Sequence, residues 1–90
     1  KLDGGVSINN LDVYPNPSRD LFNISFSSDE QQDLSIRILS VVGAEVYRED
    51  KQQFVGEYTK QISLNNYRKG IYFLEIETND GVINKKLIHQ

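Results

Sequence analysis

The sequence predicts an all-β domain with seven short strands packed as a β-sandwich. Apolar and polar residues alternate with a period of two through most of the chain, as in strands that bury one face. Turn-forming residues separate these segments at intervals of roughly 8 to 12 residues. Helical spacing of apolar residues is almost absent, and 90 residues are enough for one domain and too few for two.

The first three strands are predicted in the N-terminal half. Residues 11–15 alternate and end at the turn Pro15-Asn16-Pro17-Ser18, because two prolines so close together cannot sit inside a sheet ladder. Residues 22–27 form the second strand, which has one polar face. A polar turn at 28–32 leads to the third strand at 34–38.

Four further strands complete the prediction. Gly43 marks the turn before the fourth strand, and a polar connection at 50–56 precedes the fifth. A loop at 64–70 leads to the sixth, and Asn79-Asp80-Gly81 is a hairpin turn before the last, because these residues tolerate positive φ. The four strands are expected at 44–48, 58–62, 72–77 and 82–88.

The alternation also predicts the core. In the last strand both phases remain open, Ile83 with Leu87 or Val82 with Ile88, because periodicity alone does not choose between them. The other expected core residues are Leu11, Val13, Phe22, Ile24, Phe26, Leu34, Ile36, Ile38, Val46, Ile62, Tyr72, Leu74 and Ile76.

We interpret residues 1–10 as a linker and residues 11–90 as the folded domain. The first ten residues hold two glycines, two asparagines, an aspartate and a serine, which is typical of a connecting segment. The chain starts at Lys1 rather than at a methionine, which we interpret as a fragment joined to an unknown N-terminal parent domain.

Composition argues against several classes of function. The net charge is −3, with 10 basic and 13 acidic residues, so no nucleic-acid partner is expected. No apolar run approaches the roughly 20 residues of a transmembrane segment. The absence of cysteine removes disulfides, thiolate metal sites and cysteine nucleophiles. We therefore predict a domain that is not an enzyme and has no cofactor and no metal.

The remaining polar residues do not form a recognisable site. His89 is the only histidine and is expected to be solvated. Asp29, Glu30 and Asp33 lack the spacing of a calcium loop and are expected in a solvated turn. Glu75 and Glu77 form a carboxylate pair on one strand, but a sandwich of this size can hardly form the deep cleft of a glycosidase.

Five tyrosines leave a carbohydrate-binding module open as an alternative, because exposed aromatic rings can stack on sugars. Against it, Tyr72 is expected in the core, and Tyr14 and Tyr47 are expected to be partly buried, with their hydroxyls at the edge. The five are Tyr14, Tyr47, Tyr58, Tyr67 and Tyr72.

Four segments, in this order, carry a resemblance that runs from about Leu11 to Gln90. They are Val13-Tyr14-Pro15-Asn16-Pro17-Ser18 with Leu21-Phe22-Asn23-Ile24; Leu39-Ser40-Val41-Val42-Gly43-Ala44-Glu45-Val46; Ile62-Ser63-Leu64 with Lys69-Gly70-Ile71-Tyr72-Phe73-Leu74; and Asp80-Gly81 with Lys85-Lys86-Leu87-Ile88. Together they resemble the type A C-terminal sorting domain of the type IX secretion system of Bacteroidetes. Asp20, Tyr67 and His89 depart from the usual pattern without removing a motif.

The resemblance implies a seven-stranded immunoglobulin-like sandwich that acts as an address. The parent would pass through the periplasm, be recognised by the type IX translocon in the outer membrane, and reach the cell surface or the medium. In many relatives a surface sortase-like peptidase removes the domain and joins the parent to a lipopolysaccharide anchor. Such a cut would fall in or before residues 1–10.

Physical accessibility and the resemblance together give roles to named residues. The terminal edge strand, with unpaired backbone groups and a free end, is the expected contact with the translocon, through Lys85, Lys86, Leu87 and Ile88. Gly70 is expected to let the backbone approach closely before Tyr72. The remaining motif residues with an expected structural role are Pro15, Asn16, Pro17, Gly43 and Gly81. A passive spacer is a further alternative function.

Overall fold

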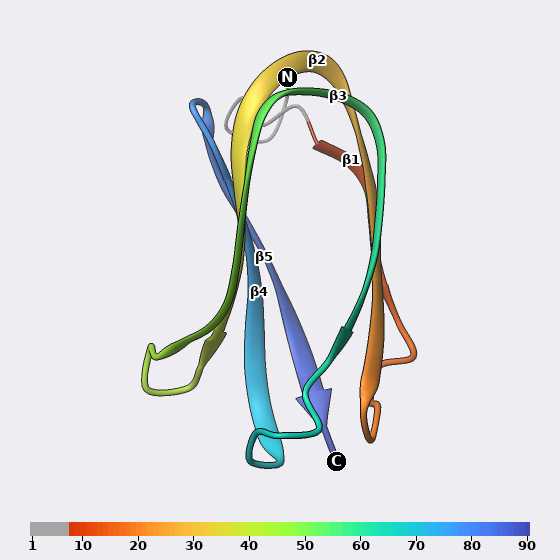
Figure 1. The fold of residues 1–90 in the computed structure, drawn as a ribbon, viewed down its shortest axis with the longest axis vertical. Helices are drawn as coiled ribbons and strands as arrows, with labels where there is room; N and C mark the ends of the chain where they lie inside the picture. Colours follow the sequence, from red (N-terminus) through yellow and green to blue (C-terminus); the bar gives the residue numbers. More distant parts are fainter. Residues whose placement is uncertain (1–7) are drawn as a thin grey trace.

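The computed structural model describes residues 8–90 as a single antiparallel sheet of five strands that curls around one core (Figure 1). The sheet order is β1-β2-β4-β5, and β3 pairs with β2. The strands are β1 Ile8–Tyr14, β2 Leu21–Ser40, β3 Glu45–Ser63, β4 Gly70–Thr78 and β5 Gly81–His89. The linker prediction lies largely on residues 1–7, which are outside the described part.

The two long strands, β2 and β3, give the sheet its curvature. They run side by side and bend together over the top of the molecule (Figure 1). The first half of β2 pairs with β1 and with the second half of β3, whereas its second half pairs with β4 and with the first half of β3. Register shifts lie between Ser28 and Leu34, where the strands bend. We call residues 28–34 and 51–56 the arch.

The prediction of seven strands is wrong, although the all-β antiparallel class is confirmed. The expected second and third strands are the two halves of β2, and the expected fourth and fifth are the two halves of β3. Pairing continues through the arch, where Ser28 faces Gly56 and Gln32 faces Phe54. The polar segments 28–32 and 50–56 were predicted to be connections because the bend of a strand and a turn between strands both carry polar residues. The immunoglobulin-like sandwich stays a prediction.

The core lies on the inward face of the curled sheet and follows the predicted alternation. Eleven of the thirteen expected residues are buried, and the other two, Leu11 and Val46, pack against the cluster. In β5 the inward phase is that of Leu87, which is fully buried, while Val82 is 44% exposed. The core also contains four residues that the prediction lacked or left open: Ile8, Tyr58, Leu64 and Leu87.

A hydrogen-bonded group joins the two halves of β3 below the arch. The carboxylate of Glu49 accepts the hydroxyl of Tyr58 at 2.5 Å and that of Tyr47 at 3.2 Å. The hydrogen bond from Tyr58 lowers the pKa of Glu49, and burial raises the pKa of Tyr58 above its ordinary value. The ring of Tyr58 also stacks on Phe26, with centroids 4.7 Å apart. This contact explains why Tyr58 is buried.

Candidate functional site

The motif segments singled out in the sequence gather mainly at one end of the molecule. The connections at residues 15–20, 41–44 and 64–69 lie at the same end as the C-terminus, and the hairpin at Asn79-Asp80 lies at the other (Figure 1). Segments far apart in the chain thus lie at the end of the molecule that carries the last residues of β5. This end is the candidate functional site.

Asn16 joins the first motif to the last one. Its side-chain Nδ2 donates to the carbonyl of Lys86 at 2.8 Å, and its Oδ1 accepts the backbone N–H of Ile88 at 2.9 Å. A side-chain amide thus pairs with the outer edge of β5 as a neighbouring strand would. Pro15 and Pro17, each preceded by a cis peptide bond, flank Asn16.

Ser18 continues this pairing to the end of the chain. Its backbone N–H donates to the carbonyl of Ile88 at 2.9 Å, and its carbonyl accepts the N–H of Gln90 at 2.8 Å. Its hydroxyl donates to the carbonyl of Leu21 at 2.6 Å, which fixes the turn itself. We call these contacts of Asn16 and Ser18 with β5 and Gln90 the clasp.

The clasp corrects the expectation that the terminal strand has a free edge. One edge of β5 pairs with β4, and near its end the other edge is paired with Asn16 and Ser18. The backbone there cannot accept an added strand unless the clasp opens. No local sequence signal predicted this, because the partners are about 70 residues apart in the chain.

The expectation of a solvated His89 is also wrong. Its side chain is 3% exposed, its Nδ1 lies 3.4 Å from the carbonyl oxygen of Ser18, and its ring lies 6.3 Å from that of Tyr72. Its position in β5 places it in the inward phase, two residues after Leu87. A residue next to the chain end is therefore part of the packed interior.

The four residues predicted to contact a translocon differ in their accessibility. Lys85 and Lys86 are exposed, and Ile88 is half-buried. Leu87 is fully buried beneath the sheet. Only three of the four therefore present side-chain surface to a partner in the folded domain.

The predicted structural residues occupy turns and the core, at or near the site except for Gly81, which lies at the opposite end of the molecule. Tyr72 is buried, as expected, and its hydroxyl donates to the carbonyl of Arg68 at 2.5 Å. Gly43 has φ +85° in the tight hairpin between β2 and β3, and Gly81 begins β5 with φ 145°. A Cβ at Gly70 would meet no atom within 4 Å, so close approach is not its role. Its φ of +148° is the reason for glycine there.

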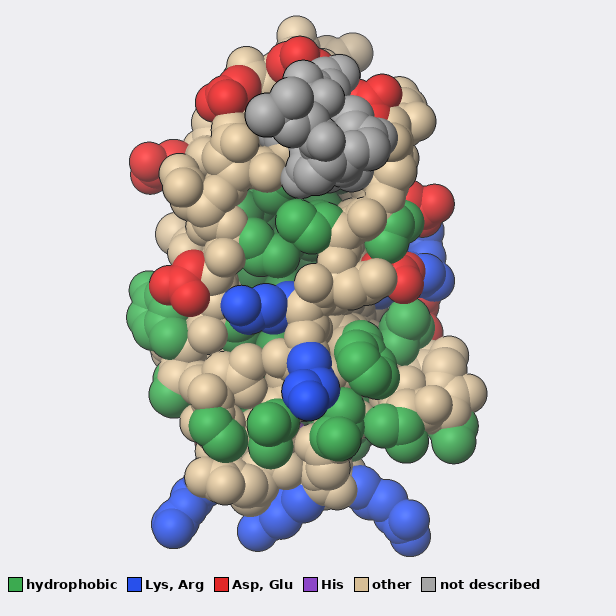
Figure 2. Space-filling model, turned by 180° about the vertical axis from the view of Figure 1, so that it is seen from behind, with side chains coloured by type: hydrophobic (Ala, Val, Ile, Leu, Met, Phe, Trp, Pro, Cys, Tyr) green, Lys and Arg blue, Asp and Glu red, His purple; other side chains and the backbone are tan. Residues whose placement is uncertain are grey.

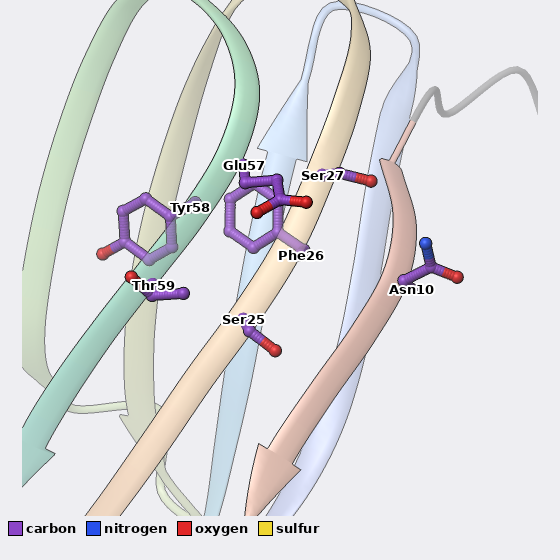
Figure 3. Close-up of a pocket in the computed structure, with 7 residues that line it drawn as sticks. All are labelled: Asn10, Ser25, Phe26, Ser27, Glu57, Tyr58 and Thr59. Carbon is purple, nitrogen blue, oxygen red and sulfur yellow. The ribbon is translucent and has the colours of Figure 1, made fainter.

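The depression formed by β1, β2 and β3 does not resemble a sugar-binding platform. One depression of about 180 Å³ lies on β1, β2 and β3, where Ser25, Ser27 and Thr59 are among its lining residues (Figure 3). Its aromatic members, Phe26 and Tyr58, are 3% and 5% exposed and stack on each other. Aromatic rings in that position cannot stack on a ligand.

Tyrosine exposure differs from the expectation at one position. Tyr47 is half-buried, as predicted, but Tyr14 is 51% exposed, and Tyr67 is 43% exposed.

Within residues 8–90, no group of three acidic or histidine side chains could hold a metal ion, and no helix is long and apolar enough to cross a membrane.

Comparison with known proteins gives one clear match. A family model described as a secretion system C-terminal sorting domain matches residues 12–90, which is most of the chain. The search of curated proteins finds no match. The matched range begins in β1 and contains both partners of the clasp, Asn16 and the end of β5.

Proposed function

Because this chain belongs to the family of secretion system C-terminal sorting domains, we propose that it directs a parent protein out of the cell through the type IX outer-membrane translocon. The parent would carry an ordinary signal peptide into the periplasm, and the folded domain would then be recognised there. The single observation that carries this proposal is the family match across residues 12–90. The source organism would be one of the Bacteroidetes, and the destination the cell surface or the medium.

Removal of the domain at the surface forms the second part of the proposal. A sortase-like peptidase would cut in or before residues 1–10 and transfer the parent to a lipopolysaccharide anchor. The body of the domain supports a cut outside it, because every strand is paired and the end of β5 is fixed by hydrogen bonds. A protease needs an extended and accessible segment, which a paired strand does not supply.

Recognition is proposed to use the end of β5. Lys85 and Lys86 are exposed and form no ion pair within residues 8–90, so both charges are available to a partner. The buried side chain of Leu87 anchors the end of β5 in the core, and the side chain of Ile88 is partly accessible. The charges make the association sensitive to salt and to charge reversal.

A reporter experiment tests this proposal. A signal peptide and a fluorescent or enzymatic reporter are fused to the chain and expressed in a bacterium with a type IX system. Deleting Lys86 to Gln90 should retain the reporter in the periplasm. Since that deletion removes the buried Leu87 and His89, the double variant Lys85→Glu, Lys86→Glu provides a test that leaves the core intact.

The control for charge is Lys60→Glu, an exposed lysine on β3 away from the tail. We expect the Lys85 and Lys86 double variant to accumulate in the periplasm and the Lys60 variant to be exported. Normal export of both the truncated and the charge-reversed fusions would show that the tail is not read.

A further inference from the structure

Near the end of the chain, only the outward face of β5 is accessible to a partner protein in the folded domain. Side chains alternate along β5, so Leu87 and His89 point inward and are buried, at 0% and 3% exposure. Lys86 and Ile88 lie on the opposite, outward face. A protein that recognises the folded tail from outside the sheet therefore meets Lys86 and Ile88 together with whatever lies beside them.

The strand register decides which residues lie beside them. Lys86 is paired with Phe73 and Ile88 with Ile71, both on β4. Phe73 is paired in turn with Leu39 on β2. Directly opposed side chains on one face of a sheet have Cβ atoms about 5 Å apart, so these residues form one continuous surface.

This surface is apolar and exposed. Phe73 is 37% exposed, Ile71 41% and Val41 65%. Val41 lines two shallow depressions of about 310 and 380 Å³, the second of which also contains Leu39 and Phe73. We define the outer patch as Leu39, Val41, Ile71, Phe73, Lys86 and Ile88.

The fold does not require apolar residues at these positions. The inward face already supplies the core, and the rest of the same outward face carries charged pairs. There Arg37 pairs with Glu75 and with Glu45, which lies 3.5 Å from it. On this face, exposed apolar side chains are thus gathered at the end of the molecule that carries the clasp, and Val82 is a single exposed apolar residue at the other end. A contiguous exposed apolar patch of this kind marks a contact surface.

Cationic groups lie along one side of the outer patch. Arg68 and Lys69 line one of its two depressions. Lys86 is itself a member of the patch, paired with Phe73. None of the three forms an ion pair within residues 8–90. On the face shown in Figure 2, several Lys and Arg side chains project from the end that carries the C-terminus and others lie in the middle, whereas Asp and Glu side chains lie in the middle and upper parts. The complementary partner surface is apolar at its centre and acidic on the side that faces Arg68, Lys69 and Lys86.

We propose that the outer patch is the docking surface for a folded protein of the translocon, so that recognition reads β2 and β4 together with the tail. This inference rests on the proposed function and extends it to residues outside the last strand. A protein fits better than a lipid bilayer, because the patch lies on the outward face of the sheet next to paired charges of both signs. Protein surfaces meet such charges at an interface rim, whereas acyl chains do not.

The test uses the reporter fusion with a variant of the patch and a matched control. Ile71→Ser with Phe73→Ser removes two apolar groups that are 41% and 37% exposed. Val55→Ser with Val82→Ser removes two that are 56% and 44% exposed but lie outside the patch. We expect the patch variant to lose export by about tenfold or more, as at an interface hot spot, and the control to be exported normally.

Two further experiments test the outer patch independently of the serine variants. Val41→Glu changes a side chain that is 65% exposed in the turn after β2 and tests the patch without replacing a core residue. A photoreactive residue in place of Val41 should form a crosslink to a translocon protein, whereas the same residue in place of Val55 should not. Thermal melting of the purified variants shows that their fold is retained.

The outcomes separate this inference from the proposed function. If the unmodified fusion is not exported, the proposed function fails. If it is exported and both the patch variant and Val41→Glu are exported equally well, the docking surface alone is overturned. A crosslink from position 41 to lipid and to no protein would also overturn it.

Discussion

The side-chain oxygen of Asn16 accepts the backbone N–H of Ile88 at 2.9 Å across 72 residues of sequence. The first and last motifs of the chain are therefore one structural unit. Asn16 and Ser18 hold the outer edge of β5, so a change at residue 16 alters the state of the tail without touching it.

Replacing Asn16 by alanine should loosen the end of β5. The change removes two hydrogen bonds, each contributing about 0.5–1.5 kcal/mol, and leaves the core residues in place. We expect hydrogen exchange at the Ile88 amide to accelerate about tenfold or more, with a smaller effect on the amides of β4. Asn84→Ala, on the exposed part of the same strand, is the matched control. Equal protection of Ile88 in both variants would contradict the clasp.

Neighbouring residues of the tail should separate stability from recognition. Leu87 is fully buried, so Leu87→Ala should lower the free energy of unfolding by about 2–5 kcal/mol. Ile88 is half-buried on the outward face, and Ile88→Ala should cost less than about 1.5 kcal/mol. Urea denaturation of the two purified variants measures the difference. Similar losses in both would mean that β5 does not have the observed phase.

Glu49 predicts an acid-dependent part of the stability. Its pKa is lowered in the folded state, chiefly by the hydrogen bond from Tyr58. Its contribution is therefore present above the ordinary glutamate pKa of about 4.3 and is lost as the pH falls through the lower folded value. Glu49→Gln keeps an acceptor and removes the charge. Its melting temperature should be below that of the parent at pH 7, and the gap should shrink below about pH 4.

The comparison for Glu49 is Glu57→Gln, an exposed residue on the other half of β3. It should show a much smaller gap at either pH. A gap for Glu49→Gln that stays constant from pH 7 to pH 3 would show that the ionised carboxylate does not stabilise the fold.

Gly70 should be sensitive to substitution because of its backbone and not because of space. Its φ of +148° lies in a region that other residues rarely adopt, and a Cβ there would meet no atom within 4 Å. Gly70→Ala should therefore cost about 1–3 kcal/mol in unfolding free energy. Lys69→Ala, at the exposed preceding residue, should be nearly neutral. A neutral Gly70→Ala would contradict the backbone argument.

Much of the fold could be predicted because alternation is a local signal. Phe22, Ile24 and Phe26 repeat every second residue, and all three are buried as expected. The arch could not be predicted in the same way, because a run of polar residues such as 28–32 occurs both in turns and in strands that bend at the surface. The predicted strand segments lie where the structure has strands. The predicted connections at 28–32 and 50–56 are instead continuous parts of β2 and β3.

The site was predicted in part for the same reason. Exposure of Lys85 and Lys86 agrees with a charged terminal strand. The burial of His89 depends on Ser18 and Tyr72, which are distant in the chain, so nothing near position 89 indicated it. The outer patch likewise depends on the pairing of β5 with β4, and a register between strands is not visible in either strand alone.

The most direct test of the central claim is the location of a reporter in two strains. A reporter with a signal peptide is joined to residues 1–90 and expressed in a bacterium with a functional type IX translocon and in an otherwise identical strain without it. The reporter without the domain is expressed in parallel. We predict that the reporter appears at the surface or in the medium only when both the domain and the translocon are present. Export without the domain, or export without the translocon, would contradict the account.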